Sequence, residues 1–102
     1  MADSMEGRRS KLELYVDVLR AVANGTRTPV RIVYAANLSY DRVMRCLEFL
    51  EERGLVKKVE ENGKKRFFAT EAGISVVRYF NEVERAIYKK RIVVSSLKEG
   101  KV

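Results

Sequence analysis

The sequence contains no histidine, no tryptophan and one cysteine in 102 residues. Without histidine, the chain lacks the side chain that most often transfers protons near neutral pH. A single cysteine forms no internal disulfide and falls far short of a zinc-binding set. We also find no glycine-rich phosphate loop and no nucleophile with an evident base beside it. We therefore expect a protein that is not an enzyme and that binds no cofactor or metal ion.

Long apolar runs are missing as well. No run approaches the roughly 20 residues that a membrane-spanning helix needs. The first ten residues, MADSMEGRRS, have no apolar centre of the kind found in a signal peptide. We expect a chain with no membrane partner that is located in the cytoplasm, where an unpaired cysteine is usual.

Positive charge is abundant and unevenly placed. The net charge is +7, and the isoelectric point is about 9.8. Residues 1–54 hold nine Lys and Arg against eight Asp and Glu, whereas residues 55–102 hold twelve against six. Such an excess favours a polyanionic partner, either nucleic acid or a membrane surface, but it says nothing about the fold.

The first half of the chain predicts three helices. The run SKLE places Ser10 at an N-cap and Glu13 three residues later, which is a capping box. An apolar face follows, and Asn24-Gly25 ends this helix. The face consists of Leu12, Tyr15, Val16, Leu19, Val22 and Ala23.

The second and third helices are joined by the tripeptide NLS. Thr28 is expected to cap the second helix, PVRIVYAA, with Pro29 at its first position. Ser39 caps the third helix, which ends at Gly54. Its core side is expected to consist of Tyr40, Val43, Met44, Leu47 and Leu50.

A hairpin and a long helix are predicted after Gly54. The runs LVKKVEE and KKRFFAT flank Asn62-Gly63, a strong two-residue hairpin signal. Phe67 and Phe68 alternate, so we expect one to be core and the other to pack on the last helix. Thr70 caps that helix, which extends from about residue 71 to about residue 97.

The predicted fold class is mainly α with a small β-hairpin: a winged helix–turn–helix plus a long C-terminal coiled-coil helix. We divide the chain into a flexible basic arm (1–9), a winged helix–turn–helix domain (10–70), a dimerisation helix (71–97) and a tail (98–102).

Two stretches, RIVYAANLSYDRVMRCLEFLEERGLV and NGKKRFFATEAG, carry a family resemblance. They resemble the small archaeal winged-helix DNA-binding proteins that dimerise through a long antiparallel C-terminal coiled coil. The resemblance implies an archaeal source, a homodimer, binding to double-stranded DNA and a place in the nucleoid. Members act as chromatin-like proteins or as transcriptional regulators, and the resemblance does not choose between these roles.

Candidate DNA-binding residues come from three segments. The N-terminal part of the third helix is expected to enter the major groove, and the hairpin to contact backbone or minor groove. The second helix is expected to contact phosphates. The candidates are Ser39, Tyr40, Arg42 and Arg45; Lys64, Lys65 and Arg66; and Arg27 and Arg31.

An alternative stays open for several of these residues. The alternative for Arg42 and Arg45 is that they are solvated and pair with Asp41, Glu48 or Glu52, and the ring of Tyr40 also fits the core side. Arg8, Arg9 and Lys11 form a basic N-terminal arm that is expected to be solvated, with a further phosphate contact as the alternative.

The last helix has apolar residues at alternating spacings of four and three, which is a heptad pattern. The expected dimer interface is Val76, Phe80, Val83, Ile87, Lys90, Val94 and Leu97. Glu84 and Arg91 share the position next to this seam, which favours an antiparallel pair in which they meet.

A second function is also possible. Glu48, Glu51 and Glu52 form an acidic cluster that would repel DNA, which favours a protein-interaction scaffold in a transcription or replication complex. No small-molecule effector site is evident. Cys46 is expected to be a small apolar residue at the edge of the core, although a redox role is an alternative.

Overall fold

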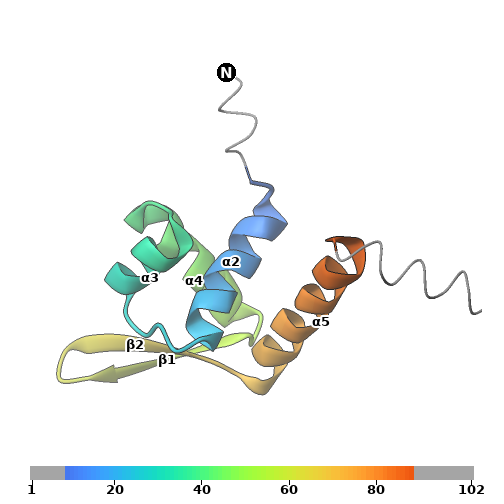
Figure 1. The fold of residues 1–102 in the computed structure, drawn as a ribbon. Coiled ribbons are helices and arrows are strands. Elements are labelled where there is room, and N and C mark those ends of the chain that lie inside the picture. The colour runs from blue at the N-terminus through green and yellow to red at the C-terminus, as the bar shows by residue number, and fades with distance from the viewer. Residues whose placement is uncertain (1–8, 89–102) are drawn as a thin grey trace, which may run out of the picture.

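The computed structural model describes residues 9–88. Its elements follow one another as α2 (Lys11–Ala23), α3 (Pro29–Ala36), α4 (Tyr40–Glu52), β1 (Val56–Glu61), β2 (Lys64–Ala69) and α5 (Glu71–Tyr88). Helices α2, α3 and α4 form a cluster, with the tip of the hairpin on one side and α5 on the other (Figure 1). The predicted fold class, a mainly helical winged helix–turn–helix with one hairpin, is confirmed in these residues.

Helix α2 lies at the centre of the core. It packs against α3, α4, α5 and β2. Leu12 was expected on its buried face but is 60% exposed, because the first turn of α2 extends beyond the elements that enclose its second half. The buried positions of α2 are Val16, Val18, Leu19, Ala21 and Val22.

The caps define where the helices begin. The Ser10 hydroxyl accepts from the Glu13 amide at 3.1 Å and the Glu13 carboxylate from the Ser10 amide at 2.8 Å, so the capping box is confirmed. The Ser39 hydroxyl accepts from the Arg42 amide at 3.2 Å. Thr28 occupies the N-cap position of α3, but its side chain makes no capping bond, contrary to expectation.

Helix α4 buries Val43, Cys46, Leu47 and Leu50. Tyr40 does not belong to this side, because it is 53% exposed. It is the first residue of α4, and burial begins one turn later, at Val43.

An aromatic pair joins α4 to α2. The rings of Tyr15 and Phe49 stack with their centroids 4.2 Å apart and their planes 9° from parallel. A stacked aromatic pair contributes about 0.5–1.5 kcal/mol beyond the burial of its apolar area. This contact fixes the second half of α4 against the central helix.

The hairpin turns at Asn62 and Gly63, which have φ values of 51° and 76°. Both turn residues therefore have the positive φ that the Asn-Gly signal predicts. The strands pair antiparallel, from Val56 opposite Ala69 to Glu61 opposite Lys64. Phe67 is the core phenylalanine, whereas Phe68 is half-buried.

Helix α5 is anchored where it begins. The Thr70 amide donates to the Leu55 carbonyl at 3.0 Å, and the Thr70 hydroxyl donates to the Gly54 carbonyl at 2.7 Å. The same hydroxyl accepts from the Gly73 amide at 3.1 Å. A Cβ on Gly73 would lie 2.1 Å from the Leu55 carbonyl oxygen, so only glycine allows this approach.

The later turns of α5 leave the core. Val76 and Val77 pack against it, but Val83 and Ile87 are 50% and 63% exposed. The predicted continuation of this helix to residue 97 lies outside the described residues. Within residues 9–88, no helix is both long enough and apolar enough to span a membrane.

Candidate nucleic-acid interface

The helix–turn–helix unit presents the N-terminal half of α4. The turn before it has Asn37 in the left-handed conformation, with φ of 58°, and the Leu38 amide donates to the Val33 carbonyl at 3.2 Å. Arg42 and Arg45 are exposed and lie three residues apart, so they share one face of the helix.

Arg45 forms an ion pair on that face. Its guanidinium lies 2.5 Å from the Asp41 carboxylate, one turn earlier, and the two side chains are 72% and 73% exposed. An exposed pair at this spacing contributes about 0.3–0.5 kcal/mol. Arg45 can therefore exchange this partner for a phosphate or a base at little cost. Arg42 makes no ion pair within residues 9–88.

Ser39 and Tyr40 stand at the start of the same helix. The Ser39 oxygen is used in the cap, but its hydroxyl hydrogen is still available as a donor. Tyr40 is exposed, so its phenol is also accessible from solvent. The structure thus brings the four α4 candidates to one end of one helix.

The hairpin candidates, Lys64, Lys65 and Arg66, are all exposed. The strand register places Glu61 opposite Lys64 and Glu60 opposite Lys65, so two of the three cations face a carboxylate across the hairpin. The two-residue turn dictates this register, and the sequence alone would have allowed the pairing to be deduced. Lys57 and Lys58 on β1 are also exposed and keep the hairpin net positive.

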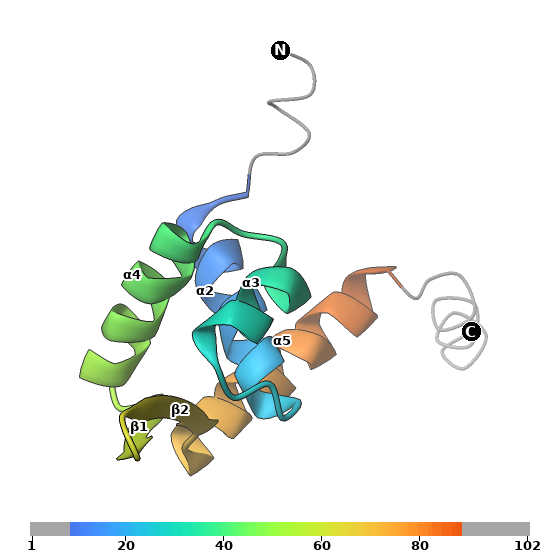
Figure 2. The same ribbon diagram turned by 90° about the vertical axis from the view of Figure 1, so that its left-hand side faces the viewer.

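Helix α4 and the hairpin occupy neighbouring positions on the molecule. Figure 2 shows α4 descending along one side toward the hairpin, with α3 beside it. Helix α4 also packs against β1. The hairpin adjoins the C-terminal end of α4, so Arg42 and Arg45, near its N-terminal end, are separated from the hairpin cations by much of the length of this helix.

The two α3-region candidates, Arg27 and Arg31, differ sharply. The Arg27 guanidinium donates to the Val22 and Phe67 carbonyls at 3.1 and 3.0 Å, and it lies over the Phe68 ring, 4.2 Å from its centroid. The Phe67 amide in turn donates to the Arg27 carbonyl at 2.8 Å. Arg27 therefore ties the α2–α3 loop to β2.

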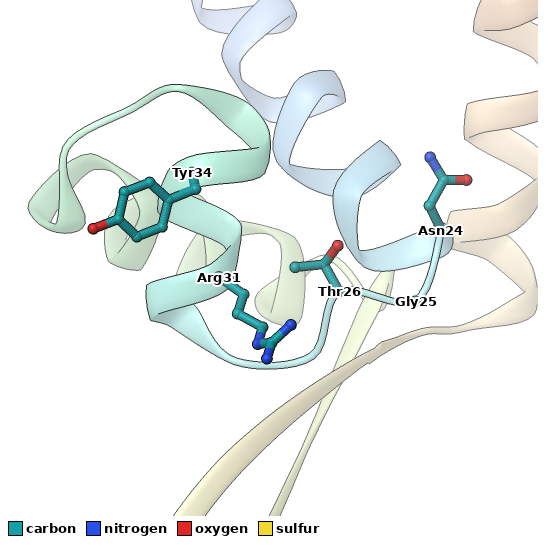
Figure 3. A pocket seen from close by; sticks show the side chains of 5 residues that line it. All are labelled: Asn24, Gly25, Thr26, Arg31 and Tyr34. Atoms are coloured by element: carbon teal, nitrogen blue, oxygen red, sulfur yellow. The ribbon is translucent and has the colours of Figure 1, made fainter.

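Arg31 is exposed and lines an open cavity of about 480 Å³. Figure 3 shows Arg31 directed toward the α2–α3 loop, while Tyr34, from the next turn of α3, points away from it. The other lining residues are Asn24, Gly25 and Thr26. Arg31 is thus available to an external anion in a way that Arg27 is not.

A second cavity adjoins α4. It has a volume of about 570 Å³ and places Lys11 near Arg42 and Arg45, with Cys46 among the lining residues. Burial raises the pKa of the Cys46 thiol above its ordinary value, while the Arg42, Arg45 and Arg9 charges lower it by less. Cys46 is buried, as expected of a small apolar residue. No group of three metal-ligating side chains occurs within residues 9–88.

Sequence reasoning missed Arg9. Its guanidinium pairs with Asp17 at 2.7 Å and donates to the Ala36 and Asn37 carbonyls at 2.9 and 2.8 Å. The expectation of a solvated Arg9 therefore does not hold. No local pattern indicates these contacts, because two of the partners are 27 and 28 residues away.

The predicted dimer residues fall into three groups. Val76 packs against the core of its own chain, and Phe80 is half-buried with the Arg20 guanidinium 5.6 Å from its ring centroid. Val83 and Ile87 are exposed, as a dimer interface requires. The remaining calls, Lys90, Val94 and Leu97, lie outside the described residues.

Glu84 has a partner within its own chain. Its carboxylate accepts from Arg20 of the same chain at 2.9 Å. Arg91 lies outside the described residues, so the expected meeting of Glu84 with Arg91 across an antiparallel pair stays a prediction.

Comparisons with known proteins agree on the architecture. A family model described as winged helix-turn-helix matches residues 8–88. The uncharacterized protein MJ0287 of Methanocaldococcus jannaschii is 33% identical over 66 residues. That match covers 65% of this chain and 64% of the relative, just under two thirds of its length.

Two solved structures are similar to this chain over most of its length. Sso10a-2, a DNA-binding protein from Sulfolobus solfataricus, is 26% identical with a TM-score of 0.62, covering 87% of this chain and 96% of that one. FabT of Streptococcus pneumoniae, solved in complex with DNA, has a TM-score of 0.64 over 97% of this chain and 77% of that one. Its identity of 14% means that this likeness concerns the fold alone.

Proposed function

The chain belongs to the winged helix-turn-helix family, and from this premise we propose that it binds double-stranded DNA as a homodimer. The N-terminal half of α4 enters the major groove, and the hairpin lies on the adjacent backbone or in the minor groove. One observation carries the proposal: Arg42 and Arg45 are exposed near the start of the second helix of the helix–turn–helix, and α4 packs against a hairpin with exposed cations. The 26% identity to Sso10a-2, whose name describes it as DNA-binding, supports it.

Arg42 and Arg45 are the proposed base or phosphate contacts of the major groove. Arginine pairs bidentately with guanine, and either side chain also binds a phosphate. Ser39 and Tyr40 add hydroxyl donors at the same end of α4. With two arginines and no amide side chain in this part of the helix, we expect limited sequence discrimination, and phosphate contacts supply much of the affinity.

The hairpin and α3 supply the other proposed contacts. Lys64, Lys65 and Arg66 contact backbone or minor groove, and Arg31 contacts a phosphate beside the loop before α3. Arg27 contributes differently from our sequence prediction: its guanidinium is already bonded inside the chain, and it holds β2 in place. Arg27 is therefore assigned to the stability of the fold and not to direct contact with DNA.

Dimerisation is assigned to α5. Val83 and Ile87 expose apolar surface on a helix whose earlier turns pack against the core. The heptad pattern continues to residue 97 in the sequence, and such a stripe is stable when a second helix covers it. Residues 10–70 then form the DNA-binding unit, and residues 71–97 form the dimerisation helix. The arm at 1–9 precedes them and the tail at 98–102 follows.

We propose that the dimer acts in the nucleoid, as a transcriptional regulator or as a chromatin protein.

The double variant Arg42→Ala/Arg45→Ala tests the DNA-binding surface. We expect its affinity for duplex DNA to fall about 100-fold or more, since each good arginine contact contributes about 1–3 kcal/mol. The measurement is fluorescence anisotropy of a labelled duplex. The matched control is Glu48→Gln/Glu52→Gln, at the other end of the same helix, which is expected to bind at least as tightly as the wild type.

The same variant separates the alternative function. Glu48, Glu51 and Glu52 are exposed at the C-terminal end of α4, which is the observation that favours a protein-interaction scaffold. If the arginine variant binds duplex DNA as well as the wild type, Arg42 and Arg45 are not the DNA-binding surface. If the wild type itself does not bind duplex DNA, the DNA-binding proposal is wrong and the scaffold gains support. A gel shift with random and genomic duplexes in excess competitor then distinguishes a regulator, which retains a discrete site, from a chromatin protein.

A further inference from the structure

A row of charged side chains crosses the molecule along α2. It begins at Arg9, just before α2, continues through Asp17 and Arg20 on the helix, and ends at Glu84 on α5. Arg9 contacts the turn before α4, and Glu84 belongs to the helix on the opposite side of the core (Figure 1). The row therefore connects the turn before α4, in the proposed DNA-binding unit, to α5, the proposed dimerisation helix.

The first end of the row holds the helix–turn–helix turn. The Arg9 guanidinium donates to the carbonyls of Ala36 and Asn37, the last residue of α3 and the left-handed residue after it. Carbonyls at a helix C-terminus have no partner within the helix, and a cation there also suits the helix dipole. Arg9 thus fixes the place at which the chain turns from α3 into α4.

The other end holds α5. The Arg20 guanidinium donates to the Asn81 side-chain oxygen at 3.0 Å and to the Glu84 carboxylate at 2.9 Å. These contacts lie beyond Val76 and Val77, the last residues of α5 that pack on the core apart from half-buried Phe80. Arg20 therefore links α2 to the part of α5 that lies beyond Val76 and Val77.

Asp17 joins the two ends. One carboxylate oxygen pairs with Arg9 at 2.7 Å, and the other lies 3.6 Å from Arg20. All three side chains are about one quarter exposed, so salt screens this cluster less than it screens pairs at the open surface. Because two guanidiniums share one carboxylate, the loss of either changes the balance at the other. Without Arg9, Asp17 competes with Glu84 for Arg20.

We propose that Arg9, Asp17 and Arg20 form a positioning relay that fixes α5 relative to the recognition helix α4, with Asp17 as its central residue. The consequence for DNA rests on the proposed function. In a dimer joined through α5, the angle between α5 and α4 determines the distance between the two recognition helices. The relay itself does not contact DNA.

The coupling is tested without DNA by a double-mutant cycle between Arg9→Gln and Glu84→Gln, which alter its two ends. The measurement is amide hydrogen exchange in the full chain. We expect Arg9→Gln to raise exchange at α5 amides near Asn81 by about threefold, although Arg9 does not contact α5. We also expect the two changes to be non-additive and the coupling to vanish in an Asp17→Asn background. Additive effects in both backgrounds would overturn the relay.

The consequence for DNA is tested with Asp17→Asn and two duplexes. One has about 12 base pairs, which is room for one recognition helix, and the other about 30, which is room for both. We expect affinity for the long duplex to fall about tenfold, since a misplaced second site loses its avidity, while the short duplex is bound within about twofold of the wild type. An equal loss on both duplexes would mean a merely structural role and would overturn the proposal.

The two proposals fail in different ways. If the wild type binds neither duplex at low salt, the proposed function is wrong, and the exchange cycle still decides whether the relay exists. If the wild type binds DNA but Asp17→Asn matches it on both duplexes, the DNA-binding proposal stands and the positioning role is wrong. Glu48→Gln, an exposed change with no ion pair in the described residues, is the control for both assays.

Discussion

The arginines around α2 and those of α4 differ in what holds them, although a count of charges treats them alike. Arg9, Arg20 and Arg27 are partly buried and bonded to carbonyls or side chains of their own chain. Arg42 and Arg45 are exposed, and the one ion pair between residues 9 and 88 that involves either of them lies at the surface. Only the exposed cations, and not all of those that make up the net charge of +7, are therefore available to bind a polyanion.

The difference has a simple energetic origin. A guanidinium that leaves water must replace its hydration with hydrogen bonds, so a partly buried arginine is found with several partners. A surface arginine needs none and can accept a new anion. Partners and exposure thus separate the arginines that hold this fold together from those available for binding.

The largest effect concerns the surface arginines and the hairpin. With on the order of six phosphate contacts per dimer, affinity for duplex DNA is expected to fall roughly 10³-fold between 50 and 200 mM salt, because binding releases condensed counterions. Anisotropy titrations at several salt concentrations measure the slope. An affinity that barely changes over this range would show that the exposed cations do not neutralise phosphates.

The next effect concerns the scaffold. Gly73→Ala is expected to destabilise the fold by about 3 kcal/mol, because the new Cβ overlaps the Leu55 carbonyl and forces α5 away from the core. This outweighs the roughly 1 kcal/mol that alanine otherwise gains over glycine in a helix. Urea denaturation measures the change, with exposed Glu71→Ala as the control. A variant as stable as the wild type would show that α5 is not docked this closely.

The smallest expected effect is on the pH dependence of stability, and it concerns Cys46 on the buried side of α4. Burial raises the pKa of this thiol, so the folded state favours its neutral form. The resulting stability is fully present below the ordinary thiol pKa of about 8.5 and is lost as pH rises above it. The free energy of unfolding should therefore fall more steeply above that pH in the wild type than in Cys46→Ala. Parallel curves would contradict this, and fast labelling of the folded protein by a thiol reagent would show an accessible thiol.

Local signals predicted the fold well. The capping box at Ser10, the cap at Ser39 and the Asn62-Gly63 turn depend on neighbouring residues, and the structure contains all three. The errors came where burial depends on distant elements. Leu12 and Tyr40 fit helical faces in the sequence but lie in first turns that extend past the core.

The candidate site could be predicted only in part. The exposure of Arg42 follows from the period of α4, since its neighbour Val43 belongs to the buried face. The contacts of Arg27, in contrast, depend on Phe67 in β2, 40 residues later. Single-sequence patterns carry no information about such long-range pairs, so they could not separate Arg27 from the available cations.

The most direct test of the separation compares Arg27→Gln with Arg45→Gln. We expect Arg27→Gln to lower the free energy of unfolding by about 2 kcal/mol, through two lost charge-assisted hydrogen bonds, and to reduce DNA affinity only slightly while folded. Arg45→Gln should change stability by less than about 0.5 kcal/mol and weaken DNA binding about tenfold or more. If the two variants lose stability and affinity in the same proportion, exposure and internal partners do not separate structural from DNA-binding arginines in this protein.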